Sequence, residues 1–124
     1  MSKYHSTPAS FGYAFSGLKE AMVNEPNIRI HLLITVIAIA LGWWLRLSRT
    51  EWVILFFTIA FVLVLELINT TLEAIVDIVS PRRHPKARVA KDVSAAAVFV
   101  SAILALIVAG FIFLPKLMPF FDNL

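Results

Sequence analysis

The chain has 124 residues, 60% of them hydrophobic and 15% charged, with a formal net charge of +3 and a mean hydropathy of +0.85. This composition excludes an ordinary soluble domain and predicts a small, all-α integral membrane protein. We expect no separate soluble catalytic domain, so any active site must use the membrane helices themselves. The absence of cysteine excludes disulfides, thiol nucleophiles and cysteine-bound zinc.

The first predicted element is an amphipathic helix over residues 7–25. It is too polar to span a bilayer, so we expect it to lie along the membrane surface. A soluble helix packed on the loop of residues 81–85 is the alternative. Apolar side chains recur along the segment at helical spacing, namely Phe11, Phe15, Leu18 and Met22.

Glu25 lies at the junction with the next helix, because Pro26 disfavours helical geometry in the residue before it. Two roles fit a carboxylate at this place. Glu25 can cap the following helix, where the helix dipole favours a negative charge. It can also meet polar side chains of a neighbouring helix at the membrane interface.

Three membrane-spanning helices are predicted over residues 28–47, 51–79 and 88–114, so that residues 1–124 form a single membrane domain. Trp43, Trp44 and Trp52 form an aromatic belt at one interface. The second span is about 43 Å long, more than a hydrocarbon core of roughly 30 Å requires. Its far end should therefore emerge into the opposite interface.

The basic residues indicate the orientation in the membrane. Of the 11 lysines and arginines, only Arg46, Arg49 and Lys116 lie on the side of the tryptophan belt. By the positive-inside rule, the N-terminus and the loop between the second and third spans are cytoplasmic, and the C-terminus is outside. We expect a multi-pass protein of the cell membrane.

Four polar residues lie on one face of the second span within an arc of roughly 80°. They are Glu66, Asn69, Glu73 and Asp77. Because a charge in hydrocarbon costs roughly 2.5 to 3.5 kcal/mol, several carboxylates there indicate a function. Glu66 is the deepest, about 21 Å from Trp52, and desolvation makes it a better base than a water-exposed carboxylate. The alternative is a set of carboxylates that neighbouring groups neutralise.

The loop after the second span and the start of the third are basic, with the sequence PRRHPKARVAKD. Lys86, Arg88 and Lys91 fall in the first turns of the third helix, where cations oppose the helix dipole. A bound phosphate would reverse that sign, because exposed N–H groups and basic side chains both favour it. The alternative is that these charges only hold the loop inside the cell.

Carboxylates with an amide suit Mg²⁺, and the basic loop suits phosphate, which are the parts that phosphoryl transfer needs. No nucleotide-binding motif of the usual kinases is present. An acceptor at the depth of Glu66 would be a lipid hydroxyl, so the residues predict a lipid kinase. A small proton- or ion-conducting membrane oligomer that uses buried carboxylates is the main alternative. A membrane scaffold without catalysis is a third.

The segment ELINTTLEAIVD, followed by SPRRHPKARVAKD, resembles the signature of the prokaryotic diacylglycerol kinase family, which includes undecaprenol kinases. The segment GYAFSGLKEAMVNEPNIRIHLL resembles the N-terminal half of that family. The resemblance implies a homotrimer of three-span subunits, each with a surface helix, and active sites between neighbouring subunits. It also implies ATP and Mg²⁺, with diacylglycerol or undecaprenol as the acceptor, and no nucleic-acid partner.

The resemblance further implies a role for each matching residue. Glu66 would be the catalytic base, and Glu25 and Glu73 would hold Mg²⁺. Arg82 and Arg83 stand where the family often has an acidic and an aromatic residue. The remaining assignments are Asn69 and Asp77 as supporting residues, Glu66 and Ala95 near the lipid, and Tyr13, Glu25, Glu73, Arg82, Arg83, His84, Lys91 and Asp92 near ATP.

Overall fold

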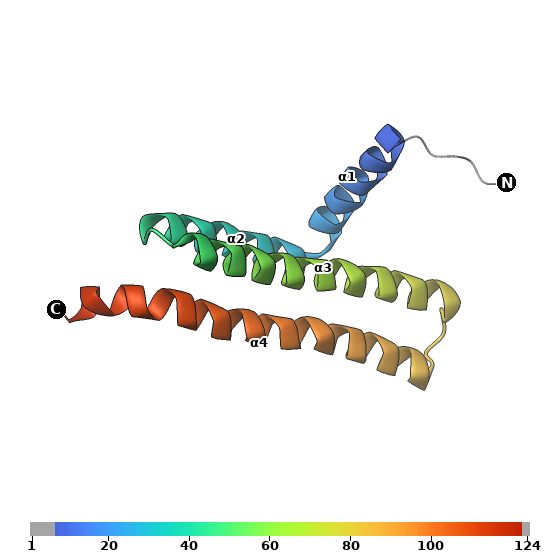
Figure 1. The fold of residues 1–124 in the computed structure, drawn as a ribbon. Helices are drawn as coiled ribbons and strands as arrows, with labels where there is room; N and C mark the ends of the chain where they lie inside the picture. The colour runs from blue at the N-terminus through green and yellow to red at the C-terminus, as the bar shows by residue number, and fades with distance from the viewer. Residues whose placement is uncertain (1–6, 123–124) are drawn as a thin grey trace.

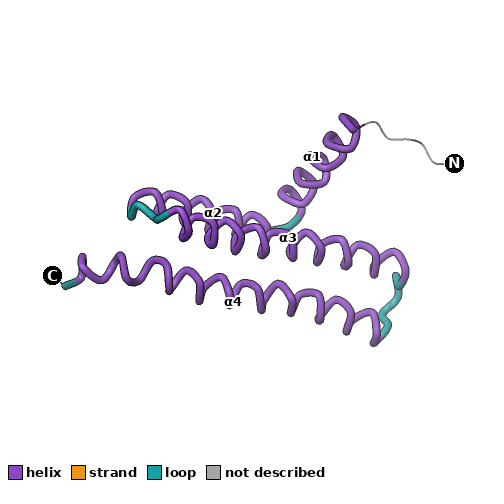
Figure 2. The backbone as a smooth tube through the Cα atoms, in the orientation of Figure 1, coloured by secondary structure: helices purple, strands orange, loops and turns teal. Residues whose placement is uncertain are grey.

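The computed structural model describes residues 7–122, and residues 1–6 and 123–124 of the predicted domain lie outside that range. The described part is helical, with helices joined by short loops (Figures 1 and 2), which confirms the all-α prediction. The helices are α1 (Thr7–Asn24), α2 (Pro26–Trp44), α3 (Arg49–Val79) and α4 (Pro85–Phe121).

Helices α2, α3 and α4 are long and apolar enough to cross a membrane, which confirms the prediction of three long apolar helices. They lie side by side, with α3 packed against both α2 and α4 (Figure 1). Much of their apolar surface is exposed in the single chain, including Phe57 at 75% and Phe111 at 80%. Such surface needs lipid or another chain to cover it.

The observed bounds of all four helices differ from those that the sequence favours, and the differences in α2 and α4 have a clear physical reason. Helix α2 begins at Pro26, because a proline in the first turn loses no helical hydrogen bond. Helix α4 continues to Phe121 through Pro115 and Pro119, although proline ordinarily ends a helix. The last turns of α4 are held by packing, since Phe120 stacks on Trp44 of α2 with ring centroids 5.3 Å apart.

The end of the bundle that holds the α2–α3 turn is closely packed. A buried cluster there consists of Leu47, Leu55, Ile112 and Phe113, drawn from the turn, α3 and α4. Ser48 and Glu51 form a capping box at the start of α3, in which the Glu51 N–H donates to Ser48 Oγ and the Ser48 N–H donates to Glu51 Oε2. Lys116 of α4 pairs with the same carboxylate at 3.2 Å.

Helix α1 leans away from the three long helices and meets α2 at Glu25 (Figure 1). Ala21 is the residue of α1 that is buried. The aromatic side chains of α1 are largely exposed, with Phe11 at 64% and Phe15 at 69%. A position along the membrane surface, with these side chains in the lipid, stays a prediction.

Candidate active site

Glu66, Asn69, Glu73 and Asp77 lie on one face of α3 because the helix is unbroken over this range, and we call them the α3 stripe. The stripe runs from the interior of the bundle to its surface. Glu66 is 1% exposed and Asn69 is 7% exposed. Glu73 is half-buried and Asp77 is exposed. The carboxylates therefore pass from a dry to a wet environment within three helical turns.

Glu66 is buried within the bundle. Its Oε2 atom is buried and has no hydrogen-bond partner among the described residues. The electrostatic environment of the Glu66 carboxylate includes Asn27 and His31, from the first turns of α2, and Glu73 of α3. A buried carboxylate oxygen without a donor costs free energy that a bound hydroxyl would offset.

Asn69 orients the next carboxylate of the stripe. Its Nδ2 donates to Glu73 Oε1 at 3.2 Å, one helical turn further along α3. The Asn69 Oδ1 atom is buried and unpartnered within the described part of the chain. Asn69 thus limits the positions that the Glu73 carboxylate can take, as outer-shell partners of metal ligands do.

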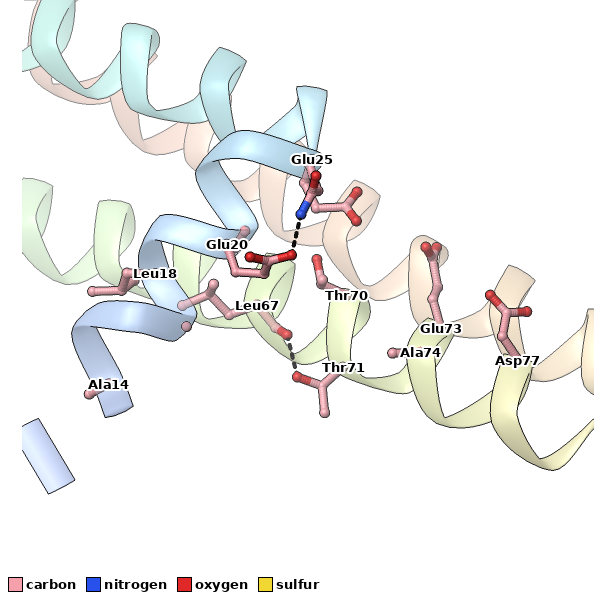
Figure 3. Close-up of a pocket in the computed structure, with 13 residues that line it drawn as sticks. Ala14, Leu18, Glu20, Glu25, Leu67, Thr70, Thr71, Glu73, Ala74 and Asp77 are labelled. Atoms are coloured by element: carbon pink, nitrogen blue, oxygen red, sulfur yellow. Dashed lines mark hydrogen bonds between the residues drawn. The ribbon is translucent and has the colours of Figure 1, made fainter. Parts of the chain in front are cut away.

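A cavity of about 660 Å³ lies between α1 and α3, and we call it the acidic cavity. Glu25, Glu73 and Asp77 line it, as do Glu20 and Thr70 (Figure 3). All of its titratable lining residues are acidic. Because like charges repel in one cavity, this arrangement favours a bound cation.

A second cavity of about 730 Å³ lies at the α3–α4 loop, and we call it the basic cavity. Lys91 Nζ contacts Asp77 Oδ1 at 2.5 Å, and Asp77 lines both cavities. The two cavities therefore meet at this ion pair. Of the residues that the sequence assigns to phosphate, Arg88 and Lys91 line the basic cavity and Lys86 does not. The basic cavity is also lined by residues that the resemblance places near ATP, namely Arg82, Arg83 and His84.

His84 has a local structural role at the basic cavity. It is the N-cap of α4, and its Nδ1 accepts a hydrogen bond from the Lys86 N–H at 3.2 Å. That contact satisfies one of the N–H groups that a helix start leaves free. Pro85 has no N–H and the Arg88 N–H donates to the His84 carbonyl at 3.1 Å, so the backbone of this turn keeps few donors for an anion.

Four residues that the resemblance assigns to substrates do not line either cavity in this single chain, namely Tyr13, Glu66, Asp92 and Ala95. Tyr13 is exposed on α1, next to Ala14 of the acidic cavity. Asp92 is exposed and pairs with Arg88 at 3.7 Å. Ala95 is exposed on α4. The structure thus brings Glu25, Glu73 and Asp77 to one cavity and leaves these four residues outside it.

The acidic cavity has carboxylates that could bind a metal ion. No group of three or more histidine, cysteine, aspartate or glutamate side chains within residues 7–122 is close enough to hold one. Two carboxylates of one cavity, Glu25 and Glu73, supply oxygen ligands. Mg²⁺ commonly binds one or two carboxylates and completes its shell with phosphate oxygens and water. These residues fit Mg²⁺ that arrives with a nucleotide.

Comparison with known proteins decides the family. The family model described as prokaryotic diacylglycerol kinase matches residues 12–113. The chain belongs to the prokaryotic diacylglycerol kinase family. This match covers the acidic cavity, the α3 stripe and the basic cavity together.

Relatives in the prokaryotic diacylglycerol kinase family carry two different names. The chain is 39% identical over 108 residues to the undecaprenol kinase of Bacillus subtilis (strain 168), which covers 87% of this chain and 88% of the relative. It is 40% identical over 110 residues to a diacylglycerol kinase of Synechocystis, covering 88% of this chain and 63% of the relative. The diacylglycerol kinase of Escherichia coli (strain K12) is 31% identical over 96 residues, covering 77% and 79%.

Thr70 is a further residue on the face of the α3 stripe, and the sequence analysis does not single it out. Thr70 lines the acidic cavity and lies four residues after Glu66 and three before Glu73. That spacing places it on the same helix face, and this was the signal that could have found it. It was missed because threonine is common in membrane helices and carries no charge.

Proposed function

We propose that the chain is an ATP- and Mg²⁺-dependent lipid kinase that phosphorylates the hydroxyl of diacylglycerol or of a polyprenol such as undecaprenol at the cytoplasmic face. The observation that carries this proposal is Glu66, a buried carboxylate with an unpartnered oxygen on the same helix face as Glu73 of the acidic cavity. Membership of the prokaryotic diacylglycerol kinase family supports it.

The proposed reaction is an in-line phosphoryl transfer. The oxygen of the lipid hydroxyl forms a bond to the γ-phosphorus of ATP as the bond to the β–γ bridging oxygen breaks, and ADP leaves with that electron pair. Glu66 accepts the proton of the hydroxyl. Its burial keeps water from competing with the lipid, and its free oxygen is the acceptor that the hydroxyl needs.

The rest of the site would hold the nucleotide. Glu25 and Glu73 would hold Mg²⁺, which neutralises charge on the phosphate oxygens when bound. Asn69 keeps Glu73 oriented through its hydrogen bond. The basic cavity would accept phosphate oxygens, because guanidinium and ammonium groups donate strong hydrogen bonds to them.

We also propose a homotrimer with sites shared between neighbouring subunits. Tyr13, Asp92 and Ala95 lie outside both cavities of the single chain, and a neighbouring copy would give exposed residues of α1 and α4 a site to join. The exposed apolar faces of the spanning helices provide surface for such contacts. Tyr13 and Asp92 would then contact ATP, and Ala95 the lipid.

The test is phosphate transfer by the purified protein in lipid nanodiscs, using ATP labelled in the γ-phosphate. We expect Mg²⁺-dependent labelling of diacylglycerol, undecaprenol or both, separated by thin-layer chromatography. A diacylglycerol whose free hydroxyl is methylated is the matched control and should remain unlabelled. Absence of transfer to either alcohol would contradict the proposal, and proton flux through the protein in vesicles would favour a conducting oligomer.

A further inference from the structure

The threonines of α3 fall into two groups by the partner of their hydroxyl. Thr58 Oγ1 donates to the Ile54 carbonyl at 2.8 Å, and Thr71 Oγ1 donates to the Leu67 carbonyl at 2.9 Å. This bond to the carbonyl one turn earlier is the usual solution for threonine within a helix. Thr70 Oγ1 is buried and has no partner among the described residues.

Thr70 lines the acidic cavity, and its hydroxyl oxygen is covered by neighbouring atoms in the single chain. In Figure 3 the Thr70 side chain points toward the end of α1, where Glu20 and Glu25 lie, whereas the Thr71 hydroxyl turns to the backbone of its own helix. Along the axis of α3, Thr70 is about 6 Å from Glu66 and about 4.5 Å from Glu73. It therefore lies between the proposed base and the proposed metal ligand, at the level where phosphate would pass to the lipid.

The chemistry around Thr70 indicates what it would bind. A buried hydroxyl without a partner costs free energy, so a native helix keeps one where something completes it. The titratable residues of the cavity are acidic and offer acceptors, and a phosphate oxygen there needs donors. The amide of Asn24, another donor of this cavity, is bonded to Glu20 at 2.5 Å. A hydroxyl donates a strong hydrogen bond to a charged phosphate oxygen.

We propose that Thr70 is a further catalytic residue, whose hydroxyl donates a hydrogen bond to an oxygen of the phosphoryl group during its transfer to the lipid. This inference rests on the proposed lipid kinase function. Thr70 keeps its proton throughout, and the proton of the acceptor still goes to Glu66. The hydrogen bond would lower the barrier because a fixed donor stabilises charge in the transition state more than in bound ATP.

The test compares three variants of the full-length protein in nanodiscs. Thr70→Val removes the hydroxyl with little change of shape, and Thr70→Ser keeps it. Thr58→Val is the matched control, because it removes a hydroxyl of α3 that lies outside the cavity and is bonded to backbone. We expect Thr70→Val to lower kcat about 10- to 100-fold, with KM for ATP and lipid changed less than about twofold. Thr70→Ser and Thr58→Val should keep nearly all activity.

A second measurement separates a catalytic from a structural hydroxyl. The thermal unfolding midpoint of Thr70→Val should equal or exceed that of the wild type, since the variant removes an unsatisfied polar group. A lower midpoint, or a change confined to KM, would overturn the inference. Unchanged kcat of Thr70→Val beside an active wild type would overturn this inference alone. A wild type inactive on both lipids would overturn the proposed function and the inference together.

Discussion

Glu66 combines two properties that helices in a membrane rarely tolerate together. It is 1% exposed, and one of its carboxylate oxygens has no donor in the described part of the chain. Asn69 and Thr70 also have a buried oxygen that has no hydrogen-bond partner within residues 7–122. Because each such group costs free energy in the unliganded chain, these three within two helical turns support the proposed ligand site.

Replacement of Glu66 by glutamine tests the assignment of the base. Glu66→Gln keeps the shape of the side chain but cannot accept the hydroxyl proton, so turnover should fall by about 100-fold or more. The fold should be retained or become more stable, because a buried charge is removed. Radiolabelled transfer and thermal unfolding measure the two effects.

Asp122→Asn provides the control for Glu66→Gln. It removes a carboxylate from the exposed C-cap of α4, at the closely packed end of the bundle. Its turnover should match that of the wild type. Full turnover in Glu66→Gln would show that another group accepts the proton.

Glu73→Gln addresses the metal site. It removes one of the two carboxylates that we assign to Mg²⁺ and alters the group that Asn69 holds. We expect the affinity for Mg²⁺–ATP to fall about 10- to 100-fold, measured by titration with a non-hydrolysable ATP analogue. Higher Mg²⁺ concentrations should restore part of the binding. An unchanged affinity would remove Glu73 from the metal site.

At the level of the helices, the two ends of the bundle differ in how they are built. The end with the α2–α3 turn has a buried apolar cluster, a capping box and the Lys116–Glu51 ion pair. The opposite end has the two cavities and the largely exposed loop of residues 81–84. Elements with few buried apolar contacts open most easily, so we expect motion to be concentrated at the site end.

The capping box predicts a stability effect that is separate from catalysis. Ser48→Ala removes the acceptor of the Glu51 N–H and should lower the free energy of unfolding by about 1 kcal/mol. Unfolding by denaturant in micelles measures the loss, and turnover should hardly change. Ser16→Ala, on the exposed surface of α1, is the control and should have little effect. Equal stability of the two variants would exclude a stabilising cap.

At the level of the whole molecule, the single chain leaves most of its spanning surface apolar and exposed. Lipid and neighbouring copies are the two environments that suit such a surface. Apart from the carboxylates in the middle of α3, charge is gathered near the ends of the helices, with the basic cavity at one end and the Lys116–Glu51 pair at the other. This distribution is the basis of the proposed orientation, with the basic loop inside the cell.

The orientation can be measured by labelling, because the chain contains no cysteine. Single cysteines at Arg49→Cys and Arg82→Cys place one thiol near each end of α3. In intact cells, a membrane-impermeant maleimide should label position 49 and leave position 82 unlabelled until the membrane is permeabilised. The reverse pattern would place the basic cavity outside the cell and contradict ATP binding from the cytoplasm.

The sequence was sufficient for the features that depend on local chemistry. Apolar runs long enough to cross a bilayer set the three long helices, because backbone groups in hydrocarbon must bond within the helix. The spacing of Glu66, Asn69 and Glu73 placed them on one helix face, because helical geometry is the same in any fold. The motif of that face, continued into the basic loop, led to the family.

Only the tertiary structure decided which side chains lie near one another and which lack a partner. It placed Glu25 and Glu73 in one cavity, although they come from different helices, and it joined Asp77 to Lys91 across the α3–α4 loop. In the folded chain α4 continues past Pro115, although proline ordinarily ends a helix, because packing against α2 and α3 outweighs the lost hydrogen bond. The tertiary structure also left the Thr70 hydroxyl free, which no pattern in the sequence states, because a hydrogen bond depends on the positions of both its atoms.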